Sequence, residues 1–242
     1  MTDLPTMRLA EAHAGLHALE AEVEATLWDP ALDEAAALAK YRQNRTALEV
    51  LMARCDPEAL SACQALLAYT LLREDDLAVE IEGDLSASLE RMERAVALAE
   101  ASGNRVQLGR CLMVLGERLI VAERPEAARG VWDRCEAMGR ANDDTQHRQL
   151  LGWLLLMRTR QALREYNFER ALALAQEARG LLEASEDEAG LGALFVVLAL
   201  LYEAQGRPPA EIAIAHAEAG RWTARARAKR EANAGLSREP PP

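Results

Sequence analysis

The densest run of basic residues lies near the C-terminus of an otherwise acidic chain, around Trp222. Its members are Arg221, Arg225, Arg227, Lys229 and Arg230. Such a cluster on one helix can bind phosphate groups, an acidic partner protein, or an acidic surface of a second copy, such as Asp75 and Asp76 or residues 186–188. Alternatively, it forms a capping helix whose polar outer face keeps the end of a helical array soluble. We favour the capping interpretation and keep contact with an acidic partner as the alternative.

Two histidines are spaced so that they could share a metal ion. His13 and His17 stand four residues apart on one expected helix, with Glu20 one turn further on. No further ligand is defined by the sequence, so we predict ordinary surface histidines, no metal site and no cofactor. His147 and His216 are isolated, and we expect no catalytic role for them.

Short motifs that carry catalysis are absent from the sequence. It contains no phosphate-binding G-x-x-x-x-G-K-[ST], no G-x-G-x-x-G after a strand, no H-E-x-x-H and no G-x-S-x-G. Gly190 and Gly192 fall within a helical pattern and do not form a phosphate loop. We therefore expect a protein that is not an enzyme, with an unrecognised all-α enzyme as the least favoured alternative.

The four cysteines are spread through helical stretches without a C-x-x-C pair, namely Cys55, Cys63, Cys111 and Cys135. This pattern favours small buried side chains in a reducing compartment. Residues 1–16 have no apolar run, and the longest apolar stretch, residues 191–202, is too short to span a bilayer. We expect a cytoplasmic protein that does not enter a membrane.

Composition indicates an all-α protein. Half of the 242 residues are apolar, and Ala, Leu, Glu and Arg, which are strong helix formers, dominate the chain. A net charge of −11 argues against a nucleic-acid surface covering the whole molecule, because phosphates would be repelled over most of it.

An N-terminal helical hairpin is predicted over residues 1–56. Its first helix should begin after Thr6 and end at Trp28, and Asp29 followed by Pro30 should cap a second helix that ends near Arg54. Arg45 interrupts the apolar face of this second helix. The hairpin is also our candidate for a homodimer contact.

Residues 57–230 read as a series of helix pairs, followed by a disordered tail over residues 231–242. An apolar helix over residues 60–72 precedes an acidic stretch, residues 73–84, which we take as a break before the next helix. Polar helix ends near Asn104, Asp144 and Asp187 then recur at intervals of 40 and 43 residues. Such pairs stack so that each covers the apolar face of its neighbour.

These residues resemble the tetratricopeptide repeat family. Leu115 and Gly116 fit the Leu-Gly step of a first helix, and Ala128, Trp132 and Cys135 fit the small, aromatic, small pattern of a second. Two further units match, through Ala171, Ala175 and Ala178 and through Ala210, Ile214 and Ala217. The repeats run about 40 residues instead of the family's 34 and lack its terminal proline, which is similar to the longer repeats of kinesin light chains and of some bacterial regulators.

The resemblance implies an α-solenoid of helix pairs, preceded by the N-terminal hairpin, with a groove lined by the first helix of each pair. The groove residues would be Arg110, Met113, Glu117, Ile120, Trp153, Leu156, Arg160, Leu163, Val196, Leu200 and Glu203. Apolar anchors mixed with arginines suit a peptide or an amphipathic helix carrying acidic groups. The alternative is that neighbouring helices, including the hairpin, cover these residues.

The function expected from this arrangement is a scaffold or adaptor that binds a segment of a partner protein in the groove. A second hypothesis is a regulator that senses a ligand or contacts nucleic acid through the basic C-terminal helix. Nucleic-acid binding of that kind would weaken steeply with salt.

Overall fold

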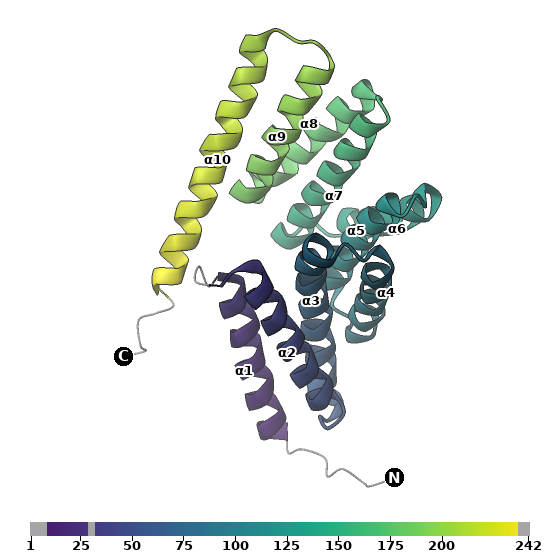
Figure 1. The fold of residues 1–242 in the computed structure, drawn as a ribbon, viewed down its shortest axis with the longest axis vertical. Coiled ribbons are helices and arrows are strands. Elements are labelled where there is room, and N and C mark those ends of the chain that lie inside the picture. The colour runs from purple at the N-terminus through teal and green to yellow at the C-terminus, as the bar shows by residue number, and fades with distance from the viewer. Residues whose placement is uncertain (1–8, 29–31, 237–242) are drawn as a thin grey trace. The chain divides into compact units, whose positions relative to one another are not determined.

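The computed structural model describes residues 9–28 and 32–236, and within these ranges the chain forms helices joined by short turns, without strands (Figure 1). The helices are α1 (Leu9–Trp28), α2 (Glu34–Met52), α3 (Pro57–Glu82), α4 (Leu85–Ser102), α5 (Arg105–Val121), α6 (Pro125–Arg140), α7 (Thr145–Arg164), α8 (Phe168–Ala184), α9 (Glu188–Ala204) and α10 (Pro209–Leu236). The prediction of an all-α protein is confirmed.

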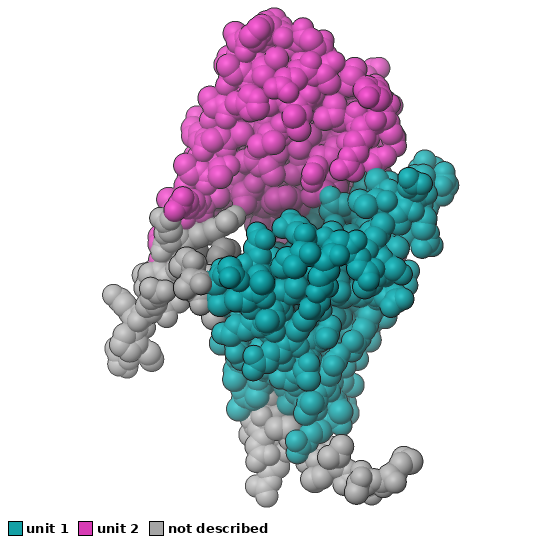
Figure 2. Space-filling view, viewed as in Figure 1, with its two compact units in different colours: residues 1–132 teal, residues 133–242 magenta. Residues whose placement is uncertain are grey.

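The chain divides into two compact units, residues 1–132 and 133–242 (Figure 2). In the first unit α1 and α2 pack on each other and on α3, which also packs on α4 and α5. In the second unit α7 packs on α8 and α9, and α9 packs on α8 and α10. The hairpin predicted over residues 1–56 is therefore part of the first unit, and the division between the units falls within α6.

Polar residues that the sequence placed near helix ends cap the starts of the following helices. The side chains of Asn104, Asp144 and Asp187 each accept a hydrogen bond from the backbone N–H three residues later, at the starts of α5, α7 and α9. Asp84 and Asn167 do the same for α4 and α8. Each cap satisfies one of the N–H groups that the first turn of a helix leaves without a partner.

A left-handed residue closes the turn inside each successive helix pair from α3 to α10. These residues are Gly83, Glu123, Tyr166 and Gly206, with φ between 57° and 67°, at intervals of 40, 43 and 40 residues. Their recurrence shows that the helix pairs are repeat-like, and that α3 and α4 form a pair whose turn also contains a left-handed residue.

Close packing at a small residue is clearest between α5 and α6. The Trp132 indole lies against Gly116 so closely that a Cβ atom at this glycine would overlap the ring. The indole Nε1 donates a hydrogen bond of 2.9 Å to the Met113 carbonyl oxygen. The Leu-Gly step and the large aromatic residue noted in the sequence thus serve helix packing.

Three predicted boundaries differ from the structure. The acidic stretch of residues 73–84 is not a break, because α3 continues through it to Glu82. The second helix begins at Glu34 with Asp33 as its cap, whereas the predicted caps Thr6 and Asp29 and the predicted start Pro30 lie outside the described residues. The predicted disordered tail is wrong for residues 231–236, which belong to α10, and residues 237–242 are not described.

Candidate functional site

The first part of the predicted groove lies on α5 in the first unit. Arg110 is exposed there, and Met113, Glu117 and Ile120 are half-buried. The Glu117 carboxylate lies 3.6 Å from the Arg118 guanidinium. Three of the four positions therefore keep only part of their side-chain surface for a partner.

The second part of the predicted groove lies on α7, where two of its residues have packing roles. Leu156 is 1% exposed, so the prediction that it lines an open groove is wrong. The Trp153 indole Nε1 donates a 2.8 Å hydrogen bond to the Asp187 carboxylate. Leu163 is half-buried, and only Arg160 of the four is exposed.

The third part of the predicted groove is an exposed stripe on α9. Val196 is 45% exposed and Leu200 is 47% exposed. They stand one helical turn apart, so both side chains lie on the same side of the helix. Exposed Glu203 follows on that side and lies 3.3 Å from His216 of α10. Because α9 packs directly on α7, we name Arg160, Val196, Leu200 and Glu203 together the α7–α9 face.

Asp187 is buried and ties α7 to the start of α9. One carboxylate oxygen caps α9 by accepting from the Gly190 N–H at 2.8 Å. The other accepts from Gln149 Nε2 at 2.6 Å and from Trp153 Nε1 at 2.8 Å. A buried carboxylate is stable here because it accepts several hydrogen bonds. Asp187 is consequently unavailable as the acidic docking surface considered from the sequence.

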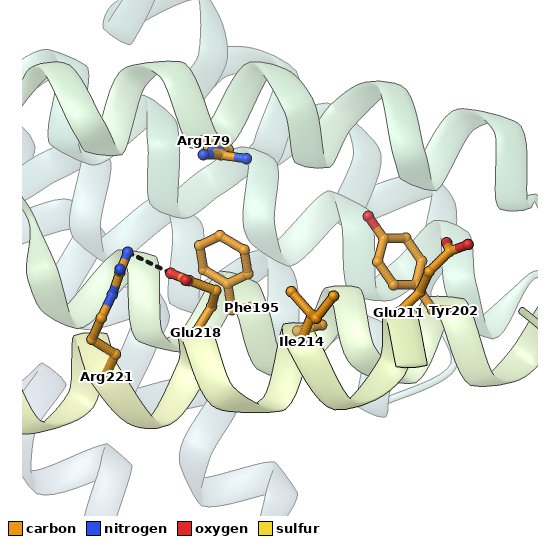
Figure 3. Close-up of a pocket in the computed structure, with 8 residues that line it drawn as sticks. Arg179, Phe195, Tyr202, Glu211, Ile214, Glu218 and Arg221 are labelled. Carbon is orange, nitrogen blue, oxygen red and sulfur yellow. Dashed lines mark ion pairs between the residues drawn. The ribbon is translucent and has the colours of Figure 1, made fainter. Parts of the chain in front are cut away.

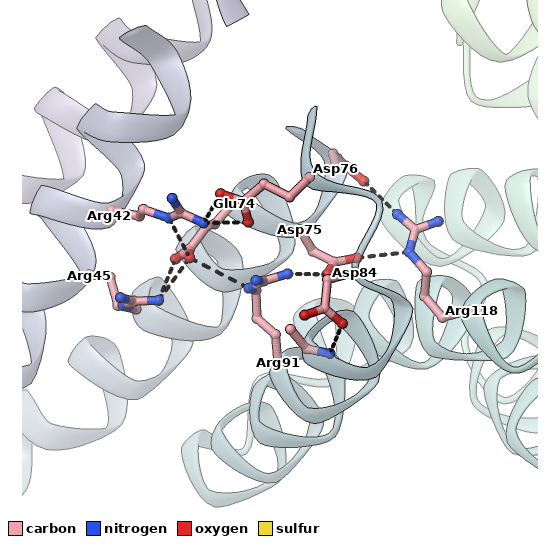
Figure 4. Close-up of polar contacts among 10 residues, drawn as sticks. Arg42, Arg45, Glu74, Asp75, Asp76, Asp84, Arg91 and Arg118 are labelled. Carbon is pink, nitrogen blue, oxygen red and sulfur yellow. Dashed lines mark hydrogen bonds and ion pairs between the residues drawn. The ribbon is translucent and has the colours of Figure 1, made fainter. Parts of the chain in front are cut away.

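A cluster of buried charges joins four helices of the first unit (Figure 4). Glu74 of α3 is buried and accepts two hydrogen bonds from Arg45 of α2, at 2.8 and 3.0 Å. Asp75, also buried, accepts from Arg91 of α4 at 2.6 Å and from Arg118 of α5 at 2.8 Å. The prediction that Asp75 offers an acidic surface is wrong, because arginines from two other helices enclose its carboxylate.

The third acidic residue of this segment, Asp76, remains partly exposed at the edge of the cluster. Its carboxylate lies 2.9 Å from Arg73 and 3.7 Å from Arg118. Burial raises the pKa of Asp76 from 3.8 to about 6, against the opposing effect of the two arginines. The protonated form of this carboxyl group is therefore favoured by folding.

Asp76→Asn is expected to reduce the dependence of stability on pH. Because the pKa of Asp76 is raised in the folded state, its favourable contribution is full below about pH 3.8 and is lost as the pH rises through about 6. Urea unfolding of wild type and variant across this range measures the difference. The control Asp143→Asn removes an exposed carboxyl whose pKa is lowered by Arg148, so its effect on the slope should have the opposite sign and should lie below about pH 3.8, where unfolding is measured as well. Equal slopes for wild type and Asp76→Asn would contradict the assignment.

The basic residues of α10 make several contacts within the second unit. Arg221 lies 2.6 Å from Glu218, and Lys229 lies 3.0 Å from Glu188. The guanidinium groups of Arg221 and Arg225 lie over the Trp222 ring, at 5.2 and 4.7 Å from its centroid. Arg227 is exposed, and the side chain of Arg230 lies outside the description. Of these contacts, only the pair between Lys229 and Glu188 joins α10 to another helix, and the others lie within α10.

Three of the four cysteines are buried, and the described histidine side chains pair with carboxylates. Burial raises the pKa of Cys63, Cys111 and Cys135 to about 12, so these thiols are protonated at neutral pH. His17 pairs with Glu20 at 3.5 Å, and the side chain of His13 is not described. Among the described residues, no three His, Cys, Asp or Glu side chains are placed to hold a metal ion.

Comparison with known proteins gives a likeness of fold alone. No protein-family model matches the chain, and no curated protein matches it by sequence. Among solved structures, it is similar to the crystal structure of BtubC (BKLC) from P. vanneervenii, with a TM-score of 0.52 and 17% identity over 96% of this chain and 94% of that one. In the described residues, no helix has the length and apolar character needed to cross a bilayer.

Proposed function

We propose that this protein is a non-catalytic scaffold, an α-solenoid of tetratricopeptide-like helix pairs that binds a segment of a partner protein. The observation that carries the proposal is the pair of exposed apolar residues, Val196 and Leu200, on one side of α9. Isolated apolar residues are common on protein surfaces, but here two stand one helical turn apart, with exposed Glu203 on the same side of α9. Exposed Arg160 lies on α7, which packs on α9.

The partner segment suited to the α7–α9 face is an amphipathic helix with an acidic residue beside its apolar stripe. Apolar side chains of such a helix would cover Val196 and Leu200, and its carboxylate would pair with Arg160. Apolar anchors at the centre of an interface carry most of its binding energy, whereas charged groups at the rim contribute mainly to specificity. In this proposal the basic stretch of α10 contributes to packing within the protein. Dimerisation through the N-terminal hairpin remains a prediction.

The double variant Val196→Asp, Leu200→Asp is expected to weaken partner binding by about tenfold or more, because two carboxylates replace the apolar anchors. Affinity capture from native lysate, with a photo-crosslinker at position 200, would identify the bound segment and measure the loss. Arg160→Glu should weaken binding to a lesser extent.

The matched control is Val50→Asp, which places the same charge at another exposed apolar residue, on α2. It should retain the partner, and circular dichroism should show the same helix content for all variants. The proposal fails if the double variant retains every partner of the wild type, or if the crosslinked segment has no apolar stripe.

A further inference from the structure

A cleft lies between α8 and α10, beside α9 (Figure 3). None of the residues that line it belongs to the α7–α9 face. Both helices pack on α9, and in the described residues they do not form a packed pair with each other. The cleft has a volume of about 330 Å³. It is lined by Arg179, Phe195, Tyr202, Glu211, Ile214, Ala215, Glu218 and Arg221. Its volume is that of a site for a small ligand.

The floor and one wall of the cleft are apolar. Phe195 and Tyr202 project from α9, and Ile214 of α10 faces the same space (Figure 3). Ile214 is 64% exposed, although large apolar side chains of a helix are usually covered by a neighbour. An aromatic ring or a branched aliphatic group of a ligand would cover Ile214 and lie against Phe195.

Two arginines stand on opposite walls near the Phe195 end of the cleft. The Arg179 guanidinium of α8 lies 5.4 Å from the Phe195 ring centroid, and its Nε donates to Glu183 at 2.7 Å. Arg221 of α10 pairs with Glu218 through one terminal nitrogen, at 2.6 Å. A guanidinium has five N–H donors, so each of these contacts leaves others for an anion.

The opposite end of the cleft is neutralised by a local pair. Glu211 lies 3.0 Å from Arg207, whose guanidinium stacks over Tyr202 at 4.5 Å from the ring centroid. The lining of the cleft therefore carries two arginines and one carboxylate, Glu218, at one end. At the other end Glu211 is paired with an arginine that lies over an aromatic ring. Such polarity orients a ligand with an anionic head and an apolar body.

We propose that this cleft binds a small carboxylic acid with an aromatic or branched aliphatic body. Its carboxylate pairs with Arg179 and Arg221, since guanidinium groups bind carboxylates through charge-assisted hydrogen bonds. Its body packs on Phe195 and Ile214 and extends toward Tyr202. This site is separate from the face proposed to bind a partner protein, so either can stand without the other.

Titration calorimetry of the full chain with 3-phenylpropanoate tests the proposal. Saturable binding is expected, and 3-phenylpropanamide and 2-phenylethylamine should bind about tenfold more weakly or worse, because neither carries a carboxylate. Arg179→Gln and Arg221→Gln should each weaken the acid about tenfold. The matched control Arg170→Gln changes an exposed arginine elsewhere on α8 and should leave the affinity unchanged.

Methyl NMR of isoleucine-labelled protein locates the ligand. Addition of 3-phenylpropanoate should shift the Ile214 methyl signals and leave those of Ile81 and Ile120 in place. The proposal is overturned if the acid does not bind, if the amide binds equally well, or if both arginine variants bind like the wild type. It is also overturned if an acetylated peptide ending in phenylalanine binds while the free acid does not, because the cleft then belongs to a protein terminus.

Discussion

Asp75→Ala is expected to lower the free energy of unfolding by about 3–5 kcal/mol. Asp75 is buried and accepts hydrogen bonds from both Arg91 and Arg118, whose side chains are themselves largely buried. Without the carboxylate, both guanidinium groups lose their shortest ion pairs and stay largely buried. Only longer contacts remain, such as those of 3.5 Å between Arg91 and Glu74 and of 3.7 Å between Arg118 and Asp76. Removing one member of such a buried pair is far less favourable than removing both. Urea unfolding followed by circular dichroism measures the change, and hydrogen exchange in α3 assigns it to the first unit.

A surface pair provides the matched control for this prediction. Glu49 and Arg94 lie 2.6 Å apart, but both side chains are exposed, so Glu49→Ala should change stability by about 1 kcal/mol or less. The double variant Asp75→Ala, Arg91→Met should lose less than the sum of its single changes, because the second change removes a charge left without its partner. A loss below about 1 kcal/mol for Asp75→Ala would show that these charges are solvated.

Asp187→Ala should lower the free energy of unfolding by about 3 kcal/mol, through two effects. The variant removes the N-cap of α9, for which about 1 kcal/mol is typical. It also leaves the Gln149 amide and the Trp153 indole without their acceptor. Both donors are half-buried, so the cost for each lies at the lower end of the about 1–3 kcal/mol of a buried donor. Urea unfolding measures the loss, and the fluorescence of Trp153 should change in the native state.

Asn167→Ala is the control, because Asn167 caps α8 of the same unit through its side-chain oxygen and is exposed. It should destabilise by about 1 kcal/mol, the contribution of a cap alone. Asp187→Asn separates the two effects further, since an amide can still cap α9 but presents only one acceptor oxygen. Equal losses for the two alanine variants would show that the contacts with α7 contribute nothing.

The helices and their recurrence were predictable because they depend on local patterns. Cap residues such as Asn104 and Asp144 act within one helical turn, and Ala128 and Trp132 repeat at helical spacing. Whether a groove residue is exposed or buried was less predictable, because this depends on how the neighbouring helix pair packs against it. Leu156 and Trp153 belong to the predicted groove pattern. In the structure Leu156 is buried, and the Trp153 indole binds Asp187 at the start of α9.

The buried charges of the first unit could not be predicted from their own segment. An acidic stretch ordinarily lies in solvent, and here the compensating arginines come from distant positions, 29 residues away for Arg45 and Glu74 and 43 for Arg118 and Asp75. One local signal was present, since Arg45 interrupts an otherwise apolar face of α2. An arginine on an apolar face indicates a buried acidic partner, but the sequence does not identify it.

The left-handed turns recur at nearly even intervals, which limits how many residues can be inserted into a helix without disturbing its packing. The one longer interval, 43 residues between Glu123 and Tyr166, includes α7, which has 20 residues where α5 and α9 have 17. Three residues rotate an α-helix by about 300°, so the side chains beyond such an insertion lie about 60° from their former direction. A single inserted residue would instead rotate the following side chains by about 100°, which would move buried alanines to the exposed side of the helix. Insertions of about one helical turn are therefore tolerated best, because they keep the buried side chains nearest to their original side of the helix.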